Sequence, residues 1–119
     1  MKTYLGAVCA LVLVGGPAVA ADDVVKIGVL GDMSGVYADG FSGRGAVAAV
    51  KMAVEDFGGS VLGHKIEILT ADHQNKPDVG SAIARKWADE DHVTLITDMT
   101  NSAVALAIQK AASDNVRRQ

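Results

Sequence analysis

The spacing of apolar residues changes several times along the chain, and the changes mark alternating strands and helices. A continuous apolar run is typical of a strand buried on both faces, and alternation is typical of a strand nearer a sheet edge. An apolar stripe at helical spacing is typical of a packed helix. These patterns predict strands over residues 24–30, 65–70 and 93–97 and helices over residues 46–57, 76–90 and 102–112. The order β-α-β-α-β-α predicts an α/β fold with a parallel sheet, right-handed crossovers and helices on both faces.

Each predicted helix has a packing stripe and end signals. The stripes are, in chain order, Ala46, Val50, Ala53 and Phe57; Val79, Ile83 and Trp87; and Val104 and Ile108. Gly58 and Gly59 end the first helix, because glycine tolerates the left-handed conformation. Asn75 and Asp78, three residues apart, predict a capping box at the start of the second helix. The polar run over residues 113–115 predicts the end of the third.

The number of strands bears on domain organisation. A doubly wound domain normally has five or six strands, whereas three are predicted here. We therefore expect this chain to be the truncated start of such a lobe, with an exposed flank on the third strand where a fourth would pair. Such a piece alone should be marginally stable.

The first 20 residues have the features of a secretion signal. Lys2 gives the start of the chain a positive charge, and the apolar run over residues 4–14 is too short to span a bilayer. The small residues Ala18 and Ala20 suit cleavage by signal peptidase. We expect residues 1–20 to be removed and residues 21–119 to lie outside the cytoplasm.

Composition excludes several function classes for the mature part. It has 10 basic and 14 acidic residues, a net charge of −4 and no basic stripe for nucleic acid. Cys9, the single cysteine, lies in the predicted signal, so we expect no disulfide or thiol chemistry. The chain contains no phosphate-binding G-x-x-x-x-G-K-[ST] or G-x-G-x-x-G motif and no G-x-S-x-G nucleophile elbow. Three histidines lack metal-ligand spacing and fit surface or loop positions: His64, His73 and His92. We therefore expect no enzyme, no cofactor and no metal site.

Candidate binding residues lie in the loops that follow the strands. In open parallel sheets, ligands bind outside the carboxyl ends of the strands. The Gly-rich loop over residues 31–45 offers Tyr37 as a stacking or hydrogen-bonding wall. Ser102 begins a helix directly after a strand, where its hydroxyl and the free N–H groups of the first turn suit a carboxylate. The alternative is that Ser102 or Asn101 only caps its own helix.

Four segments of the mature chain carry a family resemblance. Residues 26–35, 53–59, 71–76 and 101–107 resemble periplasmic substrate-binding proteins of the branched-chain amino acid type, which serve ABC transporters and have the type I periplasmic-binding fold. The resemblance implies two lobes that close on a solute between them. This chain would form the first part of the amino-terminal lobe.

The resemblance also implies site residues. In the family, the loop after the third strand holds the carboxylate of the ligand, which maps onto Asn101 and Ser102, with Thr100 beside them. The first loop supplies a wall residue, for which Tyr37 is the best match and Phe41 a second. The groups that bind a ligand's ammonium come from the second lobe.

Two departures from the family bear on this implied site and its ligand. Some members have a disulfide between the loops after strands two and three, which this chain lacks. The run over residues 72–75 is more similar to members that bind aromatic or other organic acids. The implied ligand is an amino acid or related small carboxylate, aromatic acids included. The implied partner is an ABC permease in the inner membrane, and the implied full-length state is a monomer.

Two other functions fit the same fold class. A ligand-sensing receptor domain shares this fold and would be followed by a transmembrane or signalling segment. An exported α/β hydrolase would carry its catalytic residues beyond Gln119.

Overall fold

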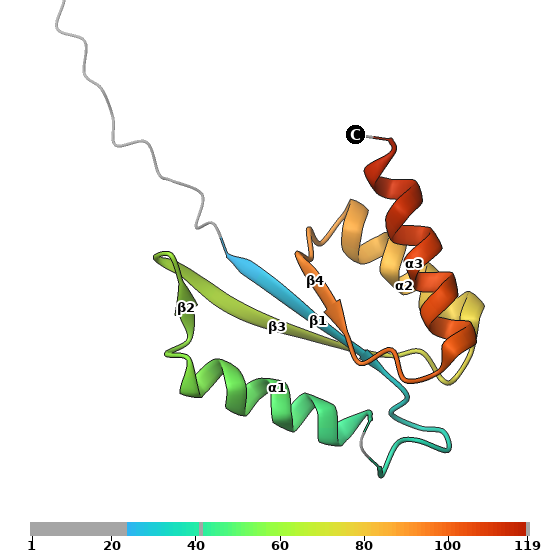
Figure 1. Ribbon diagram of the computed structural model, residues 1–119, viewed down its shortest axis with the longest axis horizontal. Coiled ribbons are helices and arrows are strands. Elements are labelled where there is room, and N and C mark those ends of the chain that lie inside the picture. The colour runs from blue at the N-terminus through green and yellow to red at the C-terminus, as the bar shows by residue number, and fades with distance from the viewer. Residues whose placement is uncertain (1–23, 41, 119) are drawn as a thin grey trace, which may run out of the picture.

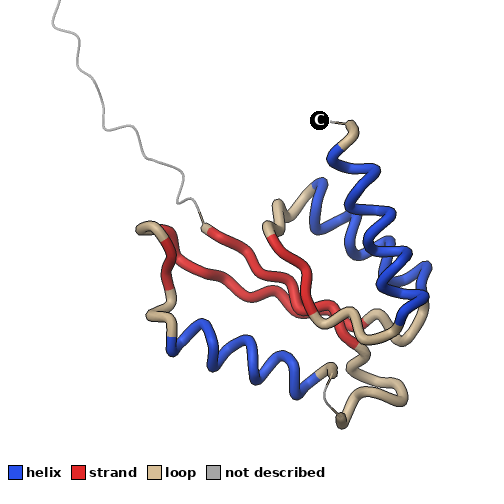
Figure 2. The backbone as a smooth tube through the Cα atoms, in the orientation of Figure 1, coloured by secondary structure: helices blue, strands red, loops and turns tan. Residues whose placement is uncertain are grey.

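The computed structural model describes residues 24–40 and 42–118, which form one sheet with helices on both of its faces (Figure 1). The elements are, in order, β1 (Val25–Gly31), α1 (Arg44–Asp56), β2 (Ser60–Val61), β3 (His64–Asp72), α2 (Pro77–Asp89), β4 (Leu95–Thr97) and α3 (Ser102–Val116). The strand order is β2-β3-β1-β4, as the red strands of Figure 2 show, and both β3 and β4 run parallel to β1. This confirms the predicted α/β fold with a parallel β-α-β-α-β-α core. The predicted secretion signal and Phe41 lie outside the described residues.

Alternation along the strands assigns each helix to a face of the sheet. Leu30 of β1 packs with α2 and α3 in the buried core, whereas Ile27, an odd number of positions away, faces α1. On β4, Ile96 packs against the buried core, whereas its neighbour Leu95 lies on the face toward α1. Right-handed crossovers from β1 to β3 and from β3 to β4 place their helices on opposite faces because the two crossovers run in opposite directions across the sheet.

The core lies between the sheet and the α2–α3 pair. Its buried residues are Leu30, Ala84, Trp87, Val104, Ile108 and Ala111. Trp87 is 5% exposed and rests on Gly28 of β1, where an added Cβ would lie 2.3 Å from the indole ring. The glycine in the middle of a strand is therefore needed for the close approach of the indole. The predicted core positions Trp87, Val104 and Ile108 are confirmed.

The apolar stripe predicted for α1 is not buried, so this prediction of a packed surface is wrong. No residue of α1 is buried, and Phe57, just after the helix, is 65% exposed. Val50, Ala53 and Val54 instead line an apolar groove of about 360 Å³ between α1 and the sheet, which Leu95 of β4 also lines. The stripe is apolar because it faces the sheet, but the groove between them stays open.

One strand and two helix ends differ from the prediction. The strand β2 pairs antiparallel with β3 through a two-residue turn, Leu62-Gly63, with φ of 51° and 83°, typical of a type I′ hairpin. The prediction of a capping box at the start of α2 is wrong. The N-cap residue is Lys76, and no side chain caps the helix. The helix α3 runs to Val116 through the polar residues expected to end it, and a 2.7 Å ion pair joins Lys110 to Asp114 one turn later.

Candidate functional site

The loops after β1, β3 and β4 lie at one edge of the sheet, at the lower right of Figure 1. Since the three strands are parallel, their carboxyl ends point the same way and their loops meet. This edge is where ligands bind in open parallel sheets. Hydrogen bonds from polar side chains at the strand ends hold the three loops together.

Asp32 organises the loop that follows β1. The residue is fully buried, and its two carboxylate oxygens accept hydrogen bonds from the backbone N–H of Gly35 at 2.7 Å and of Tyr37 at 3.1 Å. A buried carboxylate is tolerated when N–H donors satisfy it in this way. Asp32 therefore fixes the backbone of Tyr37, the predicted wall residue, whose exposed fraction is 37%.

Asp72 joins the end of β3 to the first loop. Its carboxylate accepts hydrogen bonds from the Ser34 hydroxyl at 2.6 Å and from the backbone N–H groups of Met33 at 3.0 Å and Gln74 at 2.7 Å. Burial of Asp72 opposes its ionisation, but these hydrogen bonds outweigh burial and hold the pKa of the carboxyl below its ordinary value of 3.8. The ionised carboxylate is thus part of the loop structure.

Asp98 joins the end of β4 to the far end of the first loop. One of its oxygens, Oδ2, accepts hydrogen bonds from the Ser42 hydroxyl at 3.1 Å and the Gly43 N–H at 2.8 Å. The Thr100 hydroxyl donates to the Ser42 hydroxyl at 3.0 Å. This arrangement needs a glycine at position 31, because an added Cβ on Gly31 would lie 2.1 Å from Oδ2 of Asp98.

Asn101 caps α3 and contacts the loop after β3. Its Oδ1 accepts hydrogen bonds from the N–H groups of Ala103 at 2.8 Å and Val104 at 3.1 Å, and its Nδ2 donates to Oδ1 of Asn75 at 2.6 Å. The Asn75 N–H in turn donates to Nδ1 of His73 at 3.0 Å. His73 lies in a loop, as the sequence predicted, and is fully buried there.

The four predicted site residues fall into two groups. Thr100, Asn101 and Ser102 are consecutive at the start of α3, and Tyr37 lies in the first loop. Of these three, within the described part of the chain, Thr100 hydrogen-bonds to the first loop, because its hydroxyl donates to that of Ser42. The alternative role of Asn101 as a cap of its own helix is observed. Ser102 is exposed, and its hydroxyl has no hydrogen-bond partner within residues 42–118.

The side chains that organise the first loop or join it to the others, and the side chain that joins the loop after β3 to α3, were not predicted from the sequence. They are Asp32, Ser42, Asp72, Asn75 and Asp98. The sequence does hold a signal for three of them, because an aspartate lies at or directly after the end of each parallel strand. Aspartates at these places accept hydrogen bonds from loop N–H groups.

Residues 24–40 and 42–118 contain no group of three or more His, Cys, Asp or Glu side chains that could hold a metal ion. No helix in this described part is long and apolar enough to cross a membrane.

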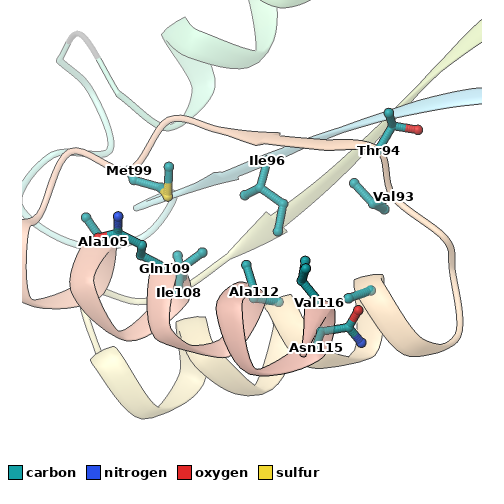
Figure 3. Close-up of a pocket in the computed structure, with 12 residues that line it drawn as sticks. Val93, Thr94, Ile96, Met99, Ala105, Ile108, Gln109, Ala112, Asn115 and Val116 are labelled. Carbon is teal, nitrogen blue, oxygen red and sulfur yellow. The ribbon is translucent and has the colours of Figure 1, made fainter. Parts of the chain in front are cut away.

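A larger groove of about 570 Å³ runs between β4 and α3 and reaches the loop after β4 at Met99 (Figure 3). Its lining is mostly apolar and includes Ile96, Met99, Ile108, Ala112 and Val116. Polar groups that converge on one point are expected in a site for a small solute. The groove flanks the free edge of β4, so we interpret it as packing surface and place the candidate site at the loops.

Comparisons with known proteins identify the family. A sequence profile described as "Periplasmic binding protein" matches residues 24–117. A search of curated proteins found no match. Among solved structures, a periplasmic binding protein from Burkholderia mallei is 48% identical, with a TM-score of 0.75, and the match covers 82% of this chain and 25% of that one.

Two further structures agree. A branched-chain amino acid ABC transporter periplasmic ligand-binding protein from Burkholderia xenovorans is 50% identical, with a TM-score of 0.73, and the match covers 77% of this chain and 24% of that one. A solute-binding protein of an ABC transporter from Rhodopseudomonas palustris, in complex with 3,4-dihydroxybenzoic acid, is 28% identical, with a TM-score of 0.71 and coverage of 77% and 25%.

This chain therefore spans about a quarter of the length of the solved relatives. The resemblance read from the sequence, to binding proteins of the branched-chain amino acid type rather than to enzymes, is confirmed. The chain belongs to the periplasmic binding protein family.

Proposed function

We propose that this chain is the first part of the amino-terminal lobe of an exported solute-binding protein that supplies an ABC permease in the inner membrane. Residues 1–20 are its cleaved secretion signal and residues 21–119 its partial lobe. The observation that carries the proposal is the meeting of three loops and the start of α3 at the carboxyl edge of the sheet, in a chain that matches periplasmic binding proteins.

The start of α3 suits an anionic ligand. A helix N-terminus carries a partial positive charge and N–H groups that point outward, and both favour a carboxylate. Asn101 already accepts from the N–H groups of Ala103 and Val104, so the hydroxyl and N–H of Ser102 are the donors left for a ligand. Tyr37 would form a wall of the site from the first loop, and Thr100 would border it.

The ligand class proposed is an amino acid or a related small carboxylate, aromatic acids included. The Rhodopseudomonas palustris relative is in complex with 3,4-dihydroxybenzoic acid, and the Burkholderia xenovorans relative belongs to a branched-chain amino acid transporter. Both kinds of compound carry a carboxylate, and the start of α3 provides donors for that group. The full-length protein is proposed to act as a monomer.

The test uses the protein purified from its own host, with calorimetry against leucine, benzoate and 3,4-dihydroxybenzoate. At least one should bind, and Ser102→Ala should weaken that binding by about tenfold or more, since a hydrogen bond to a charged group contributes about 1.5–3 kcal/mol. Ser113→Ala is the matched control, because Ser113 is an exposed serine near the other end of α3 and should leave binding unchanged. Absence of binding to all three compounds, or equal loss in the two variants, would refute the proposal.

A further inference from the structure

Both polar atoms of the Asn101 side chain have partners within the protein. Its Oδ1 accepts from two N–H groups of the first turn of α3, and its Nδ2 donates to Oδ1 of Asn75 at 2.6 Å. Turning the amide oxygen toward a ligand would remove the cap of α3. We infer that Asn75 and Asn101 form a positioning pair that holds Ser102 in place for the ligand. This inference rests on the proposed function.

The pair joins two loops that the sheet itself keeps apart. The strands β3 and β4 are not neighbours, because β1 lies between them. The hydrogen bond between Asn75 and Asn101 crosses over the end of β1 and connects the loop after β3 to the first residue before α3. Without the hydrogen bond between Asn75 and Asn101, the start of α3 loses its link to the loop after β3. Its contact with the first loop, through Asp98 and Thr100, remains.

Asn75 is itself held in a conformation that its neighbours must stabilise. Its φ of 56° is in the left-handed region, which asparagine tolerates better than most residues. The N–H of Asn75 donates to Nδ1 of the fully buried His73 at 3.0 Å. The hydrogen bonds thus form a continuous series from His73 through Asn75 and Asn101 to the first turn of α3.

The residue type at position 101 fits this double role. Serine and aspartate cap helices about as well as asparagine does, but neither side chain offers an amide donor. Asparagine caps through its oxygen and donates through its nitrogen at the same time. The variant Asn101→Ser therefore retains an N-cap acceptor and loses the bond to Asn75, which separates positioning from capping.

The test is a double-mutant cycle for ligand affinity in the protein purified from its host. The probe is whichever of leucine, benzoate and 3,4-dihydroxybenzoate the unaltered protein binds. Asn75→Ala and Asn101→Ser should each weaken binding about fivefold, as loss of one hydrogen bond would. The double variant should be no weaker than either single variant, because both remove the same bond. Gln74→Ala is the matched control, since Gln74 is the exposed neighbour with a similar φ of 53°.

A second measurement, amide hydrogen exchange, is made on the protein without ligand. Amide hydrogen exchange at Ala103 and Val104 should become several-fold faster in Asn75→Ala, and Asn75→Asp should restore slow exchange because its carboxylate again accepts from Asn101. Losses of affinity that multiply in the double variant, or unchanged exchange in Asn75→Ala, would overturn the inference. Absence of binding by the unaltered protein refutes the proposed function, whereas the exchange measurement still tests the positioning pair.

Discussion

Substitution of Gly31 by alanine should disrupt the loops at the carboxyl edge of the sheet. The added Cβ would lie 2.1 Å from Oδ2 of Asp98, well inside the 3.0 Å below which real Cβ contacts are essentially never seen. The Cα of Gly43 lies 3.1 Å from the same position, so the new methyl group has no free side to move to. Asp98 must therefore shift by about 1 Å, and its hydrogen bonds with it.

The cost follows from the bonds that Asp98 makes. Its Oδ2 accepts from the Ser42 hydroxyl and the Gly43 N–H, and both of these residues are buried. A buried donor left without its partner costs about 1–3 kcal/mol, and overpacking adds about 1–3 kcal/mol. We expect Gly31→Ala to lower the free energy of unfolding by about 2–6 kcal/mol, a large part of the roughly 5–14 kcal/mol typical of a domain this size.

The assay is urea unfolding followed by the fluorescence of Trp87, which is buried in the core and is the single tryptophan of the chain. With an m-value of about 2 kcal/mol/M, the expected loss moves the midpoint by about 1–3 M. Gly40→Ala is the matched control, because its added Cβ would meet nothing closer than the Tyr37 carbonyl oxygen at 3.8 Å. A Gly31→Ala variant within about 0.5 kcal/mol of the unaltered protein would refute the reasoning.

Two other predictions concern pH and the open sheet edge. Because the pKa of Asp72 is lowered in the folded protein, its contribution to stability is present above its ordinary pKa of 3.8 and is lost as pH falls below that value through the folded pKa. Asp72→Asn should flatten this part of the acid dependence in urea titrations, and an unchanged acid profile would contradict the assignment. At the free edge of β4, Leu95 is 55% exposed, so the 119-residue chain should self-associate as its concentration rises. Leu95→Lys should reduce that association in sedimentation velocity, whereas Leu62→Lys, at a leucine 94% exposed in the β2–β3 turn, should not; equal effects would exclude the edge as the cause.

The sequence predicted the elements whose signal is local and periodic. The strand β1 was found because its residues form a continuous apolar run. The stripes of α2 and α3 were found because apolar residues repeat at helical spacing, and Trp87 and Ile108 are buried as expected. The hairpin strand β2 was missed because two residues are too few to show a period. The helix α3 continues past residue 113, where burial of Ala111 and the ion pair from Lys110 to Asp114 outweigh the polar run.

The capping prediction at Asn75 failed for a different reason. The local pattern from Asn75 to Asp78 satisfies the rule for a capping box, but the side chain of Asn75 is used by Asn101, 26 positions away. A local rule cannot detect a competing partner that only the fold brings near. The same applies to Asp98, whose partners Ser42 and Gly43 are more than 50 positions away in the chain.

The hydrogen bonds at the carboxyl edge also set which groups face a ligand. Asp32, Asp72 and Asp98 accept from N–H and hydroxyl groups of the loops, so oxygens that would repel an anion are occupied by the protein's own donors. At the start of α3, the hydroxyl and N–H of Ser102 are donors that lie outside this network. Three carboxylates in the loops are thus compatible with the proposed anionic ligand, provided that each stays hydrogen-bonded. Stability of the loops and affinity for the ligand should therefore fall together when any of these bonds is broken.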